Sequence, residues 1–279
     1  MGGRSMKKGI KVGNVVVRKS YGKDILFRVI FIQHEDNMAV LKGIDWRLIA
    51  DSPLDDLEVV KEEEDSVPYR DANRNGGQIK PVQYMKPPNR PGQAYHAYPG
   101  KVLHMDGDAR YLALCMGEYE RLGIPAVGVH MEEREIPRAV LSLLTKYQPD
   151  ILVITGHDSY RNRERGEKDL KSYRNSHHFM EAVRRARTEY ERHKDNLIIF
   201  AGACQSYYEG MMDSGANFAS SPGRVNIHAL DPVRVVEKIS YTSIRETVPL
   251  LDAIQFTKAG NEGIGGIETR GTMRLAMPD

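Results

Sequence analysis

Hydrophobic residues follow two alternating patterns from residue 101 onward. Four nearly continuous apolar runs are separated by segments in which apolar residues recur every three or four positions. The runs are KVLHM (101–105), IPAVGVHM (124–131), DILVIT (150–155) and NLIIFAGA (196–203), and the amphipathic segments span 108–123, 136–148, 176–194 and 205–215. Because strands that are apolar along their whole length are buried on both faces, this alternation predicts an α/β fold with a doubly wound, mostly parallel sheet.

Residues at the ends of the amphipathic segments support their interpretation as helices. Asp108 precedes the first segment as a candidate N-cap, and Gly123 ends it. Ser176 is a candidate cap for the third segment. Two later segments, 225–230 and 233–240, are interpreted as weaker strands.

The first 100 residues have a different composition. Short alternating runs between residues 10 and 60, separated by turn residues such as Gly22-Lys23-Asp24 and Asp51-Ser52-Pro53, predict a small antiparallel barrel similar in size to an SH3 domain. The following stretch is rich in proline and glycine and shows no sustained periodicity. The predicted domains are therefore a small β-barrel at 1–60, a Pro/Gly-rich linker at 61–100 and an α/β catalytic domain at 101–279.

Composition narrows the classes of function. The chain has 40 basic and 38 acidic residues, a net charge of +2, so no overall field points to nucleic acid or to an anionic membrane. Two cysteines cannot form a disulfide framework, which is typical of a reducing compartment. The start lacks the apolar core of a secretory signal, no apolar run approaches about 18 residues, and no HExxH or CxxC motif occurs. We expect a soluble, cytoplasmic protein without a metal, another cofactor or a membrane partner.

Two reactive side chains follow the last two apolar runs. His157 comes after LVITG and Cys204 after LIIFAGA. In a doubly wound sheet, functional side chains collect at the carboxyl ends of the strands, near the point where the strand order reverses. With the strand order 2-1-3-4, the strands before His157 and Cys204 are neighbours, and the strand before Asp106 lies on the other side. The imidazole, the thiol and the carboxylates of Asp106 and Asp108 are then expected to open onto one cleft.

These side chains fit nucleophilic catalysis by a thiol. A nearby imidazole supplies the base that makes the Cys204 thiolate, and a position at the start of the following helix would favour the negative charge. The backbone N–H groups of Asp158 and Cys204 are candidates for an oxyanion hole. His228 is a rival base, whereas Cys115 lies among apolar helix residues and is expected in the core.

The spacing of His157 and Cys204 resembles that of the caspase, gingipain and clostripain group of cysteine proteases, although Asp158 stands where that group usually has glycine. Over most of its length the chain is more similar to the YabG family of sporulation-specific proteases. The strings that carry this resemblance are VGNVVVRKSYGKDILFRV, GHDSY, FAGACQSYYE and NFASSPGRVNIHALDPV. The resemblance implies a caspase-like sheet and proteolytic processing of spore coat proteins after basic residues. It also implies a location on the mother-cell side of the forming spore, or in the coat.

Cleavage after arginine requires a carboxylate that meets a guanidinium group beside the reactive pair. We assign Asp106 to this substrate-binding role and Asp108 to the helix cap, with Asp158 as the rival for the substrate. Two other classes of function stay open. One is a non-catalytic spore assembly or docking protein, and the other is a cysteine amidase that does not cleave proteins.

Overall fold

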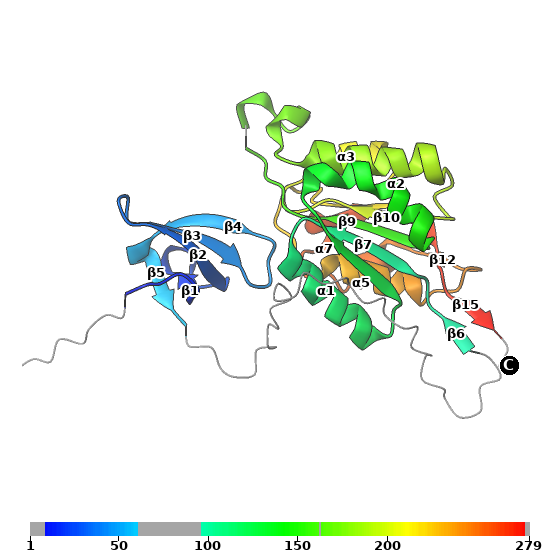
Figure 1. Ribbon diagram of the computed structural model, residues 1–279, viewed down its shortest axis with the longest axis horizontal. Helices are drawn as coiled ribbons and strands as arrows, with labels where there is room; N and C mark the ends of the chain where they lie inside the picture. Colours follow the sequence, from blue (N-terminus) through cyan, green and yellow to red (C-terminus); the bar gives the residue numbers. More distant parts are fainter. Residues whose placement is uncertain (1–8, 61–95, 162, 277–279) are drawn as a thin grey trace, which may run out of the picture. The chain divides into compact units, whose positions relative to one another are not determined.

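The computed structural model describes residues 9–60, 96–161 and 163–276. It divides into two compact units, Met1–Arg74 and Asn75–Asp279 (Figure 1). Residues 61–95, which make up most of the predicted linker, lie outside the described residues, and 96–98 form a short strand. No helix in the described part of the chain is long and apolar enough to cross a membrane.

The first unit is a five-stranded antiparallel sheet with the strand order β4-β3-β2-β1-β5. Its small core includes Val16, Phe27 and Leu41. Strand β4 contains Pro53, where the sequence predicts a turn, and proline is tolerated because β4 lies at the edge of the sheet. The elements are β1 (Val15–Arg18), β2 (Phe27–Gln33), β3 (Met38–Gly43), β4 (Ile49–Pro53) and β5 (Leu57–Val59), with 3₁₀ turns η1 (Lys19–Tyr21) and η2 (Leu54–Asp56).

The second unit is built on a six-stranded sheet with the order β13-β11-β10-β9-β7-β8. Strands β8, β7, β9, β10 and β11 run parallel, and β13 is antiparallel to β11. The first four strands of this sheet, β7 to β10, therefore have the predicted order 2-1-3-4. Their bounds are β7 (Val102–Asp106), β8 (Ala126–His130), β9 (Ile151–Thr155), β10 (Ile198–Ala201), β11 (Phe218–Ser220) and β13 (Ile264–Gly266).

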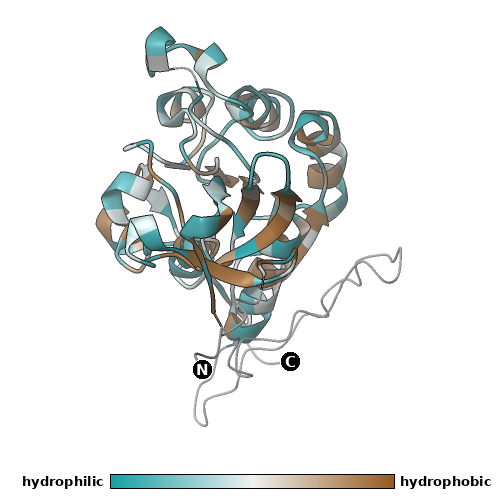
Figure 2. Ribbon diagram, turned by 90° about the vertical axis from the view of Figure 1, so that its left-hand side faces the viewer, coloured by the Kyte–Doolittle hydropathy of each residue, from teal (hydrophilic) through white to brown (hydrophobic). Residues whose placement is uncertain are grey.

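Helices cover both faces of this sheet (Figure 1). Val153 of β9 lies in a hydrophobic cluster with residues of α1 (Ala109–Leu122) and α5 (Asp231–Ser240). Its neighbour Leu152 points the other way, into a cluster with residues of α2 (Ile136–Tyr147) and α3 (Ser176–Arg185). Hydrophobic residues, brown in Figure 2, are concentrated in the strands. An α/β fold with a mostly parallel central sheet is thus confirmed.

Shorter elements complete the second unit. Strand β6 pairs with β15, and β12 pairs with β14, both antiparallel. The bounds are β6 (His96–Tyr98), β12 (Thr247–Val248), β14 (Thr269–Arg270), β15 (Arg274–Ala276), η4 (Glu133–Glu135), η5 (Arg163–Arg165), η6 (Leu170–Ser172), the π-helical turn η7 (Ala186–Tyr190), α4 (Tyr208–Asp213), α6 (Leu250–Ile254) and α7 (Gly260–Gly263).

The ends of α1 agree with the sequence prediction. A carboxylate oxygen of Asp108 accepts hydrogen bonds from the backbone N–H groups of Arg110 and Tyr111, at 2.9 and 3.1 Å. Gly123 ends the helix with a left-handed backbone at φ 70°. Both predictions follow from local chemistry, since a short acceptor side chain satisfies the first N–H groups and glycine adopts positive φ without strain.

Three predictions for later elements are wrong. Residues 233–240 belong to helix α5, in which Pro232 occupies the first turn and the apolar residues Val233, Val236 and Ile239 recur at helical spacing. The segment 225–230 is irregular rather than a strand. Ser176 does not cap α3 through its side chain, because its hydroxyl donates a hydrogen bond to Asp158 instead.

Candidate active site

The pairing of β9 with β10 relates His157 to Cys204. The first four residues of β9 pair with the residues 47 positions later in β10, from Ile151 with Ile198 to Ile154 with Ala201. His157 and Cys204 have the same separation in the sequence. Beyond the last pair, the N–H of Gly202 still donates to the carbonyl of Ile154 at 3.0 Å, which continues the ladder. The two side chains therefore follow neighbouring strand ends at matching positions.

Side-chain alternation directs both residues toward the same face of the sheet. Cys204 belongs to the cluster that contains Val153 and residues of α1 and α5. The imidazole of His157 lies beside Tyr111 of α1, with 6.0 Å between the ring centroids. These contacts are consistent with the sequence prediction that the imidazole and the thiol open onto one cleft.

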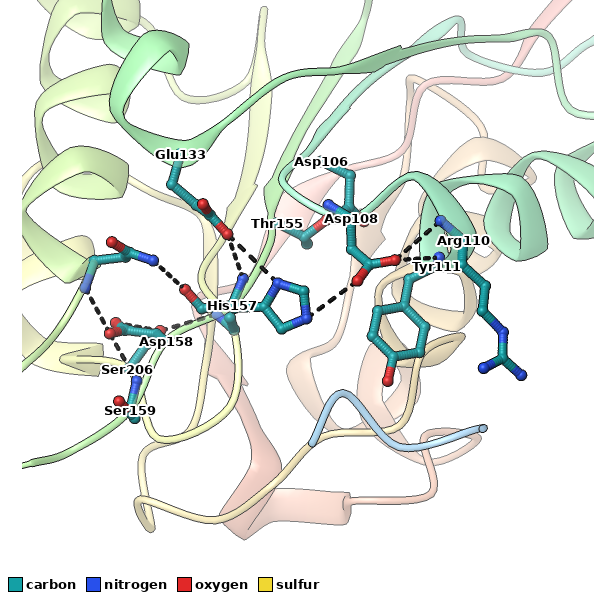
Figure 3. Close-up of polar contacts among 12 residues, drawn as sticks. Asp106, Asp108, Arg110, Tyr111, Glu133, Thr155, His157, Asp158, Ser159 and Ser206 are labelled. Carbon is teal, nitrogen blue, oxygen red and sulfur yellow. Dashed lines mark hydrogen bonds and ion pairs between the residues drawn. The ribbon is translucent and has the colours of Figure 1, made fainter. Parts of the chain in front are cut away.

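His157 lies between two carboxylates (Figure 3). Its Nε2 atom is 3.1 Å from Asp108 Oδ2, and its Nδ1 atom is 3.6 Å from Glu133 Oε1. The backbone of His157 is held as well, because its N–H donates to Glu133 at 2.8 Å and its carbonyl accepts from the Asn175 amide at 2.7 Å. The ring orientation is thus determined by the N-cap residue of α1 and by an acid of η4.

Two glycines make room for Glu133. A Cβ atom on Gly107, after β7, or on Gly156, after β9, would collide with the Glu133 side chain. Burial raises the pKa of Glu133, but hydrogen bonds from the side chain and backbone of His157 outweigh burial and hold the pKa below its usual value. Glu133 is therefore an ionised partner of His157.

Cys204 lies beneath the segment 225–227. Its Sγ atom accepts a hydrogen bond from the Ile227 N–H at 3.3 Å, and only 3% of the residue is exposed. The N–H of Gln205 donates to the Val225 carbonyl at 3.0 Å, which attaches the same segment to the chain next to the thiol. The expected position at a helix start is wrong: α4 begins at Tyr208, so the thiol receives no first-turn dipole.

Asp158 connects three segments around the site. Its carboxylate accepts hydrogen bonds from the backbone N–H groups of Ser159 and Asn175, at 2.8 and 2.7 Å, and from the hydroxyls of Ser176 and Ser206. Burial raises its pKa above the usual value, although these hydrogen bonds act in the opposite direction. A carboxylate with four internal donors has little capacity left for a substrate, so the geometry does not support its predicted role in substrate binding.

The prediction that Asp106 opens onto the cleft is wrong. The residue has no exposed surface. Its carboxylate accepts hydrogen bonds from the Asp108 N–H and the Thr155 hydroxyl, both at 2.8 Å, and lies 3.5 Å from His104. Asp106 is the last residue of β7 and alternates inward with the core, so its side chain stays under α1.

The remaining candidates lie near the site in other roles. The Nδ1 atom of His228 accepts a hydrogen bond from the Leu230 N–H, and its Nε2 atom lies 3.2 Å from the Lys258 amine. Both ring nitrogens of His228 thus face groups other than the thiol, as both ring nitrogens of His157 also do. Cys115 is fully buried, as predicted, and both cysteines are free thiols. No group of three or more His, Cys, Asp or Glu side chains within the described residues is arranged to hold a metal ion.

Comparison with known proteins identifies the family. The family model for YabG peptidase U57 matches residues 11–278. The chain belongs to the YabG peptidase family. It is 44% identical over 284 residues to the sporulation-specific protease YabG of Bacillus subtilis (strain 168), an alignment that covers 96% of this chain and 98% of that protein. No solved structure matches the chain.

Sequence reasoning missed two polar residues that hold His157 in this YabG family member, Glu133 at the ring and backbone N–H and Asn175 at the backbone carbonyl. Glu133 stands in the acidic string MEERE, where a solvated surface is the ordinary interpretation. Asn175 precedes the third helix and gives no signal beyond that of a helix start. Asp108 was expected as the helix cap and as one of two acids that open onto the cleft, but not as the acid that contacts the imidazole.

Proposed function

We propose that the chain is a cysteine endopeptidase in which Cys204 is the nucleophile and His157 is the general base. The observation that carries this proposal is a shared offset: β9 and β10 pair residues 47 positions apart, and His157 and Cys204 have the same separation. Membership of a peptidase family supports the reaction class. The strand order supports a caspase-like sheet, and the first five strands support an SH3-like module.

The reaction proceeds in two steps through a thioester. His157 removes the thiol proton, and the Cys204 sulfur attacks the carbonyl carbon of the scissile peptide. The imidazolium then protonates the leaving amine as the C–N bond breaks. In the second step His157 removes a proton from water, which attacks the thioester, releases the carboxylic acid and restores the thiol.

Fixed groups support each charge that appears in these steps. The carboxylates of Asp108 and Glu133 orient the imidazole and stabilise the imidazolium. The Ile227 N–H donates to Sγ, which favours the thiolate. The backbone N–H groups of Asp158 and Cys204 bind the oxyanion. Because Cys204 is almost fully covered, a substrate reaches it only when the segment 225–227 moves.

The proposed substrates are spore coat proteins, cleaved after arginine or lysine. Similarity over nearly the whole chain to a protease named sporulation-specific supports action during spore formation. The enzyme would then act in the mother-cell cytoplasm around the forming spore, or within the coat itself. No cofactor takes part in the proposed reaction.

The proposal is tested with the full-length protein and a library of peptides that contain single basic residues. Cys204→Ala and His157→Ala should each lower hydrolysis by about 1,000-fold or more, because each removes a group that bonds to the substrate or carries its proton. Cys115→Ala is the matched control, and its rate at a permissive temperature should be close to that of the unmodified protein. His228→Ala tests the rival base and should also retain turnover.

Other results would point to the alternative classes. Hydrolysis that survives Cys204→Ala contradicts a cysteine mechanism. Thiol-dependent hydrolysis of small amides but of no internal peptide bond would identify an amidase. Binding of coat proteins without any hydrolysis would identify a docking protein.

A further inference from the structure

A cavity of about 360 Å³ is lined in part by Gln205, the residue that follows the proposed nucleophile. Its walls are formed by Tyr160, Glu167, Gln205, Gly223 and Arg224. Gln205 directly follows Cys204, and Tyr160 lies three residues after His157. Two of the five wall residues thus lie in the segments that follow β9 and β10 and carry the proposed reacting groups.

Hydrogen bonds connect the walls of the cavity to each other. The Tyr160 N–H donates to the Gln205 side-chain oxygen at 3.3 Å, and the Gln205 amide donates to Asn226 at 3.4 Å. Gln205 and Arg224 have left-handed backbones, with φ of 55° and 54°. Such conformations are uncommon for residues other than glycine and accumulate at functional sites.

The positive charge of Arg224 is already neutralised. Its Nη2 atom donates to Glu209 at 2.5 Å, its Nε atom donates to the Tyr173 hydroxyl at 2.7 Å, and its Nη1 atom donates to the carbonyls of Ser221 and Pro222. With these donors engaged, Arg224 acts as part of the wall. It offers little charge to a ligand.

Glu167 supplies the negative charge of the cavity. Among the described residues, no Lys, Arg or His side chain lies within ion-pair distance of its carboxylate, and the residue is exposed. The other acids around the site have partners: Asp108 and Glu133 contact His157, Asp158 accepts four hydrogen bonds, and Glu209 pairs with Arg224. Glu167 is the acid with capacity for a cationic ligand.

The segment that carries Glu167 is held in place. The Tyr173 hydroxyl donates to the Glu167 carbonyl at 2.7 Å. Tyr173 in turn stacks on Tyr207, with 5.2 Å between ring centroids, and packs against Tyr160 at 5.3 Å. The carboxylate therefore projects from an anchored backbone, which reduces the entropy lost on binding.

We propose that this cavity binds the basic side chain that precedes the scissile bond, and that Glu167 pairs with its charge. The inference rests on the proposed peptidase function and names the subsite of that activity. A guanidinium group fits a carboxylate through two parallel hydrogen bonds, and the Tyr160 ring adds a surface on which the cation can stack. Glu167 thereby replaces Asp106 as the residue that determines specificity.

The test compares two fluorogenic peptide amides of one sequence, ending in arginine or in its neutral analogue citrulline. The full-length protein should prefer arginine. Glu167→Gln should lower kcat/KM for arginine by about tenfold or more and change kcat/KM for citrulline by less than about twofold, because only the charged pair is lost. Glu167→Lys should reverse the preference. Glu164→Gln, a nearby exposed acid outside the cavity wall, is the matched control and should behave like the unmodified protein.

The outcomes separate the subsite from the peptidase function. If Glu167→Gln keeps the arginine-to-citrulline ratio of the unmodified protein, the subsite is assigned wrongly, while hydrolysis that depends on Cys204 leaves the function intact. If the unmodified protein cuts neither peptide and no member of the library, the proposed peptidase function is wrong, and the subsite assignment is wrong with it. The rate of Cys204 alkylation by iodoacetamide should be the same in Glu167→Gln and in the unmodified protein. A changed rate would show that the substitution disturbs the site itself.

Discussion

The Nε2 atom of His157 lies 3.1 Å from one carboxylate oxygen of Asp108, while the other oxygen of the same carboxylate caps helix α1. One side chain thus holds both a helix start and the proposed general base. The position of the imidazole depends on α1 being correctly formed. Different substitutions at Asp108 can therefore separate the loss of the helix cap from the loss of the charge beside the imidazole.

Asp108→Asn should retain the cap but remove the charge beside the imidazole. We expect its thermal stability to stay close to that of the unmodified protein, and its kcat/KM to fall by about 10- to 100-fold, because the imidazolium loses a carboxylate partner. Asp108→Ala should lose both functions and cost about 1 kcal/mol of folding free energy in addition. Thermal unfolding and peptide hydrolysis measured on both variants check this. Equal activity of Asp108→Asn and the unmodified protein would contradict the orienting role.

Gly202, two residues before Cys204, should not tolerate a side chain. Its φ is 112°, and an added Cβ would collide with the Ser220 hydroxyl and lie 2.8 Å from the Met211 sulfur. Gly202→Ala should therefore reduce the free energy of unfolding by about 2 kcal/mol or more. Gly117 in α1 is the matched control: a Cβ there meets nothing within 4 Å, so Gly117→Ala should stabilise the protein by about 0.5–1 kcal/mol. Urea denaturation of both variants distinguishes a local clash from a general effect of alanine.

Asp158 should be important for stability rather than for substrate binding. Asp158→Ala leaves four donors without their acceptor, which should lower the free energy of unfolding by about 3 kcal/mol or more. Asp213, an exposed acid at the end of α4, serves as the control, and its alanine variant should change stability by less than about 0.5 kcal/mol. A stable Asp158→Ala variant with a specific defect toward arginine peptides would restore the original prediction for this residue.

Glu133 should make stability depend on pH. Its folded-state pKa lies below the usual 4.5, so the ionised carboxylate stabilises the fold above about pH 4.5, and this contribution is lost as the pH falls through the folded-state pKa. The stability advantage of the unmodified protein over Glu133→Gln should therefore be largest near neutral pH and shrink in acid. Glu120→Gln, on the exposed side of α1, should show no such trend. A difference that grows in acid would contradict the assignment of Glu133 as an ionised partner of His157.

The central sheet could be predicted from the sequence because each of its first four strands is marked by a local run of apolar residues. Four apolar runs identified β7, β8, β9 and β10, and the rules for doubly wound sheets gave their order. Helix α5 was missed because its β-branched residues resemble a strand, although Val233, Val236 and Ile239 have helical spacing and Pro232 fits a first turn. Strand β4 was missed because Pro53 signals a turn except at a sheet edge.

The site was harder to predict because its polar contacts join distant segments. His157 and Cys204 could be found from the strands that precede them. The sequence could not show which acid faces the imidazole. Asp106 and Asp108 are only two residues apart, and the direction of each side chain depends on where β7 ends. Glu167 lies in a polar loop without periodicity, and its position beside the cavity depends on contacts with Tyr173.

The matched positions of His157 and Cys204 depend on the ladder between β9 and β10, not on the length of chain that joins these strands. The two ends of the loop that follows His157 lie side by side, because the Arg174 N–H donates to the Ser159 carbonyl at 3.1 Å. Residues inserted or deleted between these two anchors would reshape the rim around Glu167 without shifting the proposed reacting pair. Under the proposed mechanism, evolution can therefore alter substrate preference through loop length while the bond-breaking chemistry is inherited unchanged.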